Sequence, residues 1–169
     1  MEAAAWGFVG TLVGALASIG TSWLATRSAA SAQREKVRLE WRQQYREFQI
    51  KAVTELQEIL VEFARATGKI RHIDEMRELE GHTGKPFRID EVLSDLYSQH
   101  IRRINVLLGR IDNELVQQAI TEVKSVSIIV TSGINVDTAA MLRFADVIER
   151  AGVALSRCLR SIYASELSD

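Results

Sequence analysis

Hydrophobic and polar positions divide the chain into one uniformly apolar stretch and a long remainder with helical periodicity. Residues 3–25, AAAWGFVGTLVGALASIGTSWLA, contain no charged side chain. As a helix rising about 1.5 Å per residue they extend roughly 35 Å, which exceeds a hydrocarbon core of about 30 Å. Trp6 and Trp23 stand near the two ends, where indole rings prefer the headgroup level. The pattern predicts a single transmembrane anchor at residues 1–26.

The residues after the anchor are polar and keep a helical pattern. Residues 27–40 carry many charges and little apolar surface, which predicts a solvated juxtamembrane helical stalk. From residue 41 to about residue 80, apolar side chains recur at a period near 3.6 and predict an amphipathic helix. Gly68 is a candidate for a bend or for the start of a separate segment, since glycine destabilises a helix interior by roughly 1 kcal/mol relative to alanine. The apolar or aromatic positions of this pattern are Trp41, Tyr45, Phe48, Ala52, Leu56, Ile59, Phe63, Ile70 and Ile73.

Three shorter amphipathic helices are predicted after a loop at residues 80–86, where two glycines and the only proline concentrate. Asp90, Asp112 and Asp137 are the expected N-caps of helices that run over residues 91–108, from residue 112 to about Ser132, and after Gly133. The expected core-facing positions of the first two helices are Val92, Leu93, Leu96, Ile101, Ile104 and Leu108, then Leu115, Ala119, Val123, Val126 and Val130. In the last helix the apolar stripe is a bundle core or a coiled-coil seam, and it consists of Met141, Phe144, Ile148, Ala151, Leu155, Cys158 and Ile162.

One segment leaves the fold class open at first. Residues 125–131, SVSIIVT, are rich in β-branched side chains and by themselves suit a strand. No partner strand is visible elsewhere, so the helical interpretation is kept. Short connections favour antiparallel neighbours. The sequence predicts an all-α protein in which one N-terminal transmembrane helix continues through a long stalk helix into a cytoplasmic antiparallel four-helix bundle over residues 41–169.

Basic residues cluster on the C-terminal side of the apolar stretch. By the positive-inside rule that side faces the cytoplasm, which predicts a single-pass protein of the inner (cytoplasmic) membrane with its N-terminus outside. Residues 30–32, Ala-Ser-Ala, have the form of a signal cleavage site, but Glu2 precedes the apolar run and the run is longer than a usual signal core. A retained anchor is therefore favoured. The candidates for headgroup contact, or for a topology signal without lipid specificity, are Arg27, Arg34, Lys36 and Arg38.

Small side chains recur at spacings of three and four within the apolar stretch. Gly7, Gly10, Gly14, Ala17 and Thr21 lie on one helical face, and the second and third of them form a G-x-x-x-G pair. Membrane helices pack largely through close backbone approach over small residues. The face predicts a homo-oligomeric seam. The alternative is ordinary tolerance of small residues in a membrane helix.

Four segments carry a resemblance: ASIGTSWLATRSA, QREKVRLEWRQQYREFQ, LQEILVEFARATGKI and RRINVLLGRIDNELV. They resemble a family of uncharacterised bacterial single-pass membrane proteins with an N-terminal transmembrane helix and a cytoplasmic helical domain. The resemblance covers the chain from the apolar stretch to about Val116, and its motifs are helical patterns more than chemical signatures. It implies the single-pass topology and carries no activity with it.

Composition and motifs give little indication of chemistry. The 169 residues leave room for one compact domain beyond the anchor, and a net charge of −1 gives no global argument for nucleic acid. The sequence GHTGKP at 81–86 has Leu79 where a phosphate-binding loop needs its first glycine. A di-iron bundle requires a glutamate three residues before a histidine, and none precedes His72, His82 or His100 in this way.

The remaining candidates for chemistry also have simpler interpretations. His72 and Glu75 lie one helical turn apart, where a solvated ion pair is favoured over a metal site. Cys158 is the only cysteine and lies on an apolar stripe, so a buried, inert thiol is expected. The sequence therefore predicts no enzyme, no cofactor and no metal site.

Two hypotheses for function follow. The first is a membrane-anchored, self-associating helical interaction or scaffold protein whose partners are membrane lipid, further copies of the chain and a cytoplasmic protein, with no nucleic acid. The alternative is a subunit of an oligomeric membrane channel or pore, since Thr11, Ser18 and Ser22 add hydroxyls to the apolar stretch. The absence of a charged residue from that stretch weighs against the pore.

Overall fold

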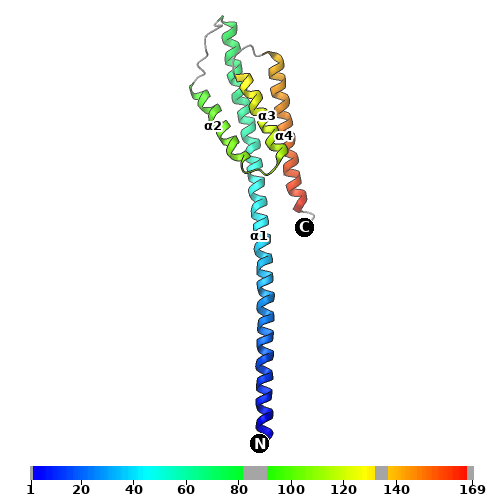
Figure 1. Ribbon diagram of the computed structural model, residues 1–169. Coiled ribbons are helices and arrows are strands. Elements are labelled where there is room, and N and C mark those ends of the chain that lie inside the picture. The colour runs from blue at the N-terminus through cyan, green and yellow to red at the C-terminus, as the bar shows by residue number, and fades with distance from the viewer. Residues whose placement is uncertain (1, 82–90, 132–136, 167–169) are drawn as a thin grey trace. The chain divides into compact units, whose positions relative to one another are not determined.

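The structure is a computed structural model that describes the backbone of residues 2–81, 91–131 and 137–166, and the side chains of Trp23 and of most of these residues from Thr26 to Ala164. The described residues form four helices, α1 (Glu2–Leu79), α2 (Glu91–Leu108), α3 (Glu114–Thr131) and α4 (Thr138–Glu166), shown in Figure 1. The described residues include no strand. The all-α prediction is confirmed, and residues 125–131 belong to α3.

Helix α1 runs over 78 residues without a break. Gly68 does not interrupt the helix or begin a separate segment, because Ala66, Thr67 and Ile70 are buried and their packing outweighs the low helix propensity of glycine. The helix ends at Leu79, and Gly81 takes a positive φ of 79° that suits glycine at a helix C-terminus. Residues 82–90, which include the expected cap Asp90, lie outside the described residues.

The chain divides into two units, Met1–Tyr45 and Arg46–Asp169. In the first unit every described side chain from Thr26 to Tyr45 is exposed. Trp41 and Tyr45 are 69% and 54% exposed, and Phe48 at the start of the second unit is 45% exposed. These three apolar positions do not face the core, because helical periodicity reveals an apolar stripe but not where its packing partners begin.

The second unit is an antiparallel four-helix bundle. The C-terminal part of α1 is followed by α2, α3 and α4, and successive helices alternate in direction (Figure 1). Helix α3 packs directly against α4. All four helices contribute to one hydrophobic core, whose largest fully buried side chains are Phe63, Leu56, Ile59, Ile70, Ile104, Leu107, Ile111, Ile120 and Leu155. Burial of this apolar surface is the main stabilising contribution to the bundle.

The turn between α2 and α3 is fixed to α1 by one side chain. The amide of Gln49, which is 7% exposed, donates from Nε2 to the carbonyl oxygen of Arg110 at 2.7 Å and accepts at Oε1 from the backbone N–H of Asp112 at 3.4 Å. The N-cap of α3 is Asn113, whose Oδ1 accepts from the backbone N–H of Val116 at 3.1 Å. The expectation that Asp112 caps this helix is therefore wrong by one residue.

Helix α4 follows its prediction closely. Asp137 caps it, since its Oδ1 accepts from the backbone N–H of Ala140 at 2.8 Å. The expected stripe faces the core: Phe144, Ala151, Leu155 and Cys158 are buried, and Met141, Ile148 and Ile162 pack against them.

The stripes of α2 and α3 were predicted less well. Val92 is 74% exposed and Leu115 is 67% exposed. The buried positions include His100 and Leu107 in α2 and Val116 in α3 instead. A wide apolar face contains more apolar positions than the core covers, so periodicity alone cannot select among neighbours.

Candidate functional site

The predicted membrane sites lie mostly outside what the structure describes. The structure describes only the backbone at the five positions of the predicted self-association face, which are Gly7, Gly10, Gly14, Ala17 and Thr21. Among the residues that are described, no helix combines the length and the apolar character needed to cross a bilayer. The self-association face in residues 3–25 thus stays a prediction.

The four basic residues expected to contact headgroups are all described and all exposed: Arg27, Arg34, Lys36 and Arg38. The guanidinium carbon of Arg27 lies 5.4 Å from the centroid of the Trp23 ring, which is cation–π geometry. Lys36 Nζ lies 3.9 Å from Glu40 Oε1, one turn along the helix. An exposed pair of this kind contributes about 0.3–0.5 kcal/mol at most, so it leaves the ammonium accessible.

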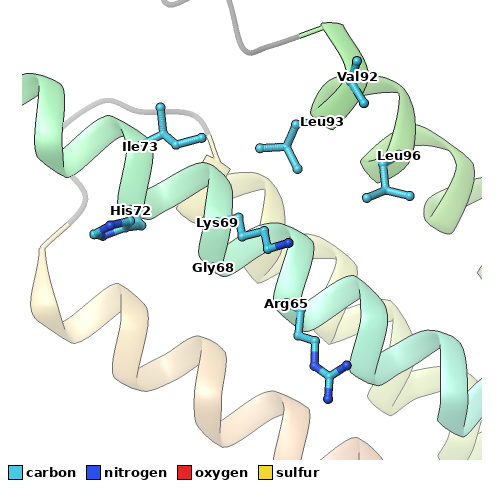
Figure 2. A pocket seen from close by; sticks show the side chains of 8 residues that line it. All are labelled: Arg65, Gly68, Lys69, His72, Ile73, Val92, Leu93 and Leu96. Atoms are coloured by element: carbon cyan, nitrogen blue, oxygen red, sulfur yellow. The ribbon is translucent and has the colours of Figure 1, made fainter.

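The bundle carries a groove between α1 and α2 of about 740 Å³, which is within the range of ligand-binding clefts, roughly 300–1,000 Å³. Figure 2 shows its lining. Arg65, Lys69 and His72 follow α1, and the apolar side chains stand mainly on α2. The full lining is Arg65, Gly68, Lys69, His72, Ile73, Val92, Leu93 and Leu96.

Contacts farther along α2 set where the groove begins. The ring of Tyr97 packs against Phe63 with centroids 5.2 Å apart, and the Tyr97 hydroxyl lies 2.9 Å from Ser127 Oγ. Beyond this point Arg103 Nη2 donates to Glu55 Oε1 at 2.8 Å. These contacts hold the C-terminal part of α2 against the bundle, and the groove lies along the N-terminal part.

Gly68 has no side chain to fill the groove on the α1 side. A Cβ placed on Gly68 would have no heavy atom within 4 Å, so the space beside it is open. On the opposite side Val92 and Leu96 are 74% and 39% exposed. The groove therefore presents apolar side chains to solvent on α2 and has open space beside Gly68 on α1.

The polar part of the groove is basic. Arg65, Lys69 and His72 stand at spacings of four and three along α1, and none of the described lining residues is acidic. The nearest acidic side chains along α1 have other partners. Glu62 Oε2 lies 3.9 Å from His100 Nδ1, and Glu75 Oε1 accepts from Arg71 Nε at 3.2 Å. Two cations beside exposed apolar surface make a site suited to an anionic, amphipathic ligand.

The contacts of Glu75 also correct a prediction. We expected an ion pair between His72 and Glu75, but the carboxylate turns to Arg71 instead. A guanidinium offers more donors in a fixed planar geometry than an imidazole does. Within the described residues, His72 has no ion pair with Glu75 and is one of the residues that line the groove.

A second groove lies along α4, and its lining carries charges of both signs. Arg150 closes one side of it through Nη2 to Glu122 Oε1 at 2.9 Å and Nε to Asp146 Oδ2 at 3.0 Å. Cys158 borders this groove but is only 5% exposed, and burial raises the pKa of its thiol. A neutral thiol is a poor nucleophile. This groove therefore combines acidic and basic side chains, Arg157 among them, and has no reactive thiolate in its described lining.

The described residues contain no group of three or more His, Cys, Asp or Glu side chains that could hold a metal ion, while His82 lies outside the described residues. Sequence reasoning did not select Arg65 and Lys69. The signal available was a basic row with i, i+4, i+7 spacing around Gly68. Comparison with protein-family models, with curated proteins and with solved structures finds no match to the chain.

Proposed function

We propose that the protein is a membrane-anchored, self-associating helical interaction protein whose bundle lies in the cytoplasm and docks a protein partner. The observation that carries this proposal is the charge-free stretch of residues 3–25 followed directly by basic residues. A stretch of this length and composition favours insertion, and the basic flank favours a cytoplasmic C-terminal side. The resemblance to bacterial single-pass membrane proteins supports the same topology.

The basic residues of α1 suit contact with lipid. Arg27 is the first charge after the apolar stretch, and Arg34, Lys36 and Arg38 follow within four turns. Their exposure leaves them accessible to anionic headgroups. Each cation near such a surface contributes on the order of 1 kcal/mol, so the group reinforces an anchor rather than replacing it.

Two features support self-association. In the apolar stretch, the small-residue face with Gly10 and Gly14 permits close helix packing. Beyond it, Val37, Trp41 and Tyr45 recur every four residues along α1, and they are 40%, 69% and 54% exposed. Large apolar side chains exposed together in this way are a feature of surfaces that bind another chain.

Cross-linking of the full chain in its membrane tests this proposal. In a Cys158→Ser background, Tyr45→Cys should give a disulfide-linked dimer under mild oxidation. Leu39→Cys should give several-fold less. Leu39 is similarly exposed, at 56%, but lies about 160° round the helix from Trp41. The Tyr45→Cys yield should fall with Gly10→Leu and persist with Leu16→Ile, because only leucine at residue 10 blocks close approach.

Equal yields from the two cysteine positions would contradict the oriented contact between copies.

The hydroxyls of Thr11, Ser18 and Ser22 favour a second candidate, a subunit of a membrane pore. Liposomes that hold the chain should show no ion flux above that of empty liposomes. A ring of copies with measurable ion flux would favour the pore over the interaction protein as the function of the chain.

A further inference from the structure

We propose that the groove between α1 and α2 binds an acidic amphipathic helix of the partner protein. This inference rests on the proposed role as an interaction protein and adds the chemistry of what is bound. Its basis is the combination in one groove of an exposed apolar wall, a basic row and an open glycine surface. Figure 2 shows these side chains together.

The apolar wall has the spacing of a helix-docking surface. Val92, Leu93 and Leu96 fall within about 100° of one another round α2, and so form one face. Val92 is 74% exposed and Leu96 is 39% exposed, while Leu93 and Ile73 are partly buried. A partner helix that lays an apolar stripe over this wall removes it from water, as in other grooves that bind a helix.

The basic row sets the sign of the partner's charge. Arg65 and His72 are seven residues apart, about 10.5 Å or two helical turns, with Lys69 between them. In the described part of the chain these three side chains make no ion pair. Carboxylates spaced three or four residues apart on a partner helix can therefore meet them without breaking an existing contact. A basic helix would bring like charges together, which costs affinity.

The shape of the groove favours a helix over a small anionic amphiphile. A small ligand is held when a cleft covers about 70–90% of its surface. With Val92 mostly exposed, the α2 wall covers one side of a ligand and leaves the other in water. A helix needs only its apolar stripe covered, since its opposite face is polar.

A titration with the full chain in nanodiscs tests the inference. The probe is a fluorescent peptide of about 18 residues, long enough to form a helix, with leucines along one face and glutamates beside them. Its fluorescence anisotropy should rise as the chain is added. A peptide of the same pattern with lysines in place of the glutamates should bind at least about tenfold more weakly.

Matched variants locate the binding. Lys69→Glu and Leu96→Glu should each weaken binding of the acidic peptide at least about tenfold. Arg143→Glu and Leu142→Glu should leave it within about twofold, because both residues are exposed on α4 and outside the groove. Circular dichroism of every variant shows whether the bundle keeps its helix content. Leu96→Ala, which keeps the surface uncharged, serves if Leu96→Glu unfolds.

Equal binding of the acidic and the basic peptide would overturn the inference, as would no binding of the acidic peptide or an equal loss with the α4 variants. If a small anionic detergent binds tightly and displaces the peptide, the ligand of the groove would be a small amphiphile and not a helix. Failure of the proposed anchoring would be seen separately, because the chain would then elute apart from the nanodiscs. The peptide titration can still be made on the chain in that case.

Discussion

At the scale of single residues, the most informative group is a buried charge cluster on α1. Arg71 and Asp74 are only 5% and 7% exposed. The Arg71 guanidinium reaches Glu75 Oε1 at 3.2 Å and Glu78 Oε2 at 3.4 Å. Desolvation raises the pKa of Asp74 above its ordinary value of 3.8, although the Arg71 charge opposes this. Desolvation therefore destabilises the ionised Asp74 carboxylate more than the charge of Arg71 stabilises it.

The raised pKa predicts how Asp74→Asn changes stability with pH. A carboxyl with a higher pKa in the folded chain than in the unfolded chain destabilises the fold when it is ionised. The loss of stability caused by ionised Asp74 is largest above the pKa that Asp74 has in the folded chain. It disappears as the pH falls from that value towards 3.8. The variant should therefore melt at a higher temperature than the parent at pH 7, and the difference should shrink on acidification. Thermal melts from pH 7 to pH 3 measure it.

The control for this comparison is Asp95→Asn, since Asp95 is an exposed aspartate on α2. Its substitution should leave the melting temperature nearly unchanged at pH 7, because a surface charge away from special features contributes little to stability. A lower melting temperature for Asp74→Asn than for the parent at pH 7 would mean that the ionised carboxylate stabilises the fold, contrary to the raised pKa.

At the scale of helices, the sequence predicted the elements better than the faces they bury. Helix α2 begins and ends where the pattern placed it, at Glu91 and Leu108, and Asp137 caps α4 as expected. Asn113 rather than Asp112 caps α3, and the pattern could not choose between two adjacent residues that both suit an N-cap. The backbone N–H of Asp112 instead donates to Gln49 Oε1. That contact joins residues 63 apart and has no local signal.

The groove shows the same limit of sequence reasoning. The apolar side chains Val92, Leu93 and Leu96 were recognised but assigned to the core. Their exposure depends on where α2 separates from α1, which is set by the contacts of Tyr97 and Arg103 farther along the helix. Such tertiary contacts leave no periodic mark in the sequence, so the site could not be predicted from the pattern alone.

The contact between α1 and the α2–α3 turn gives a prediction at this scale. Gln49→Ala removes the donor to the Arg110 carbonyl oxygen and the acceptor of the Asp112 N–H. Leaving such backbone groups without a partner costs about 1–3 kcal/mol, so urea unfolding should show a loss of this size. Gln118→Ala, an exposed glutamine on α3, should change the free energy of unfolding by less than about 0.5 kcal/mol. An equal loss in this control, or no loss in Gln49→Ala, would show that Gln49 does not fix the turn.

At the scale of the whole molecule, different parts of the chain have different proposed tasks. Residues 3–25 are the proposed anchor, the exposed stripe Val37, Trp41 and Tyr45 the proposed contact between copies, and the groove the proposed docking site. The bundle itself has a closed core formed by all four helices, so it can present a fixed groove. Each task is tested by substitutions in its own segment, and the proposed anchor decides where in the cell the other two would operate.

The anchor is therefore the central claim, and alkaline extraction of membranes from cells that express the full chain tests it most directly. The parent chain should stay in the membrane pellet. Leu12→Arg with Leu16→Arg should release it, because each central arginine costs about 2.5–3.5 kcal/mol on insertion. Leu39→Arg with Leu142→Arg, outside the stretch, should leave it in the pellet. Recovery of the parent chain in the alkaline supernatant would contradict the proposed anchor.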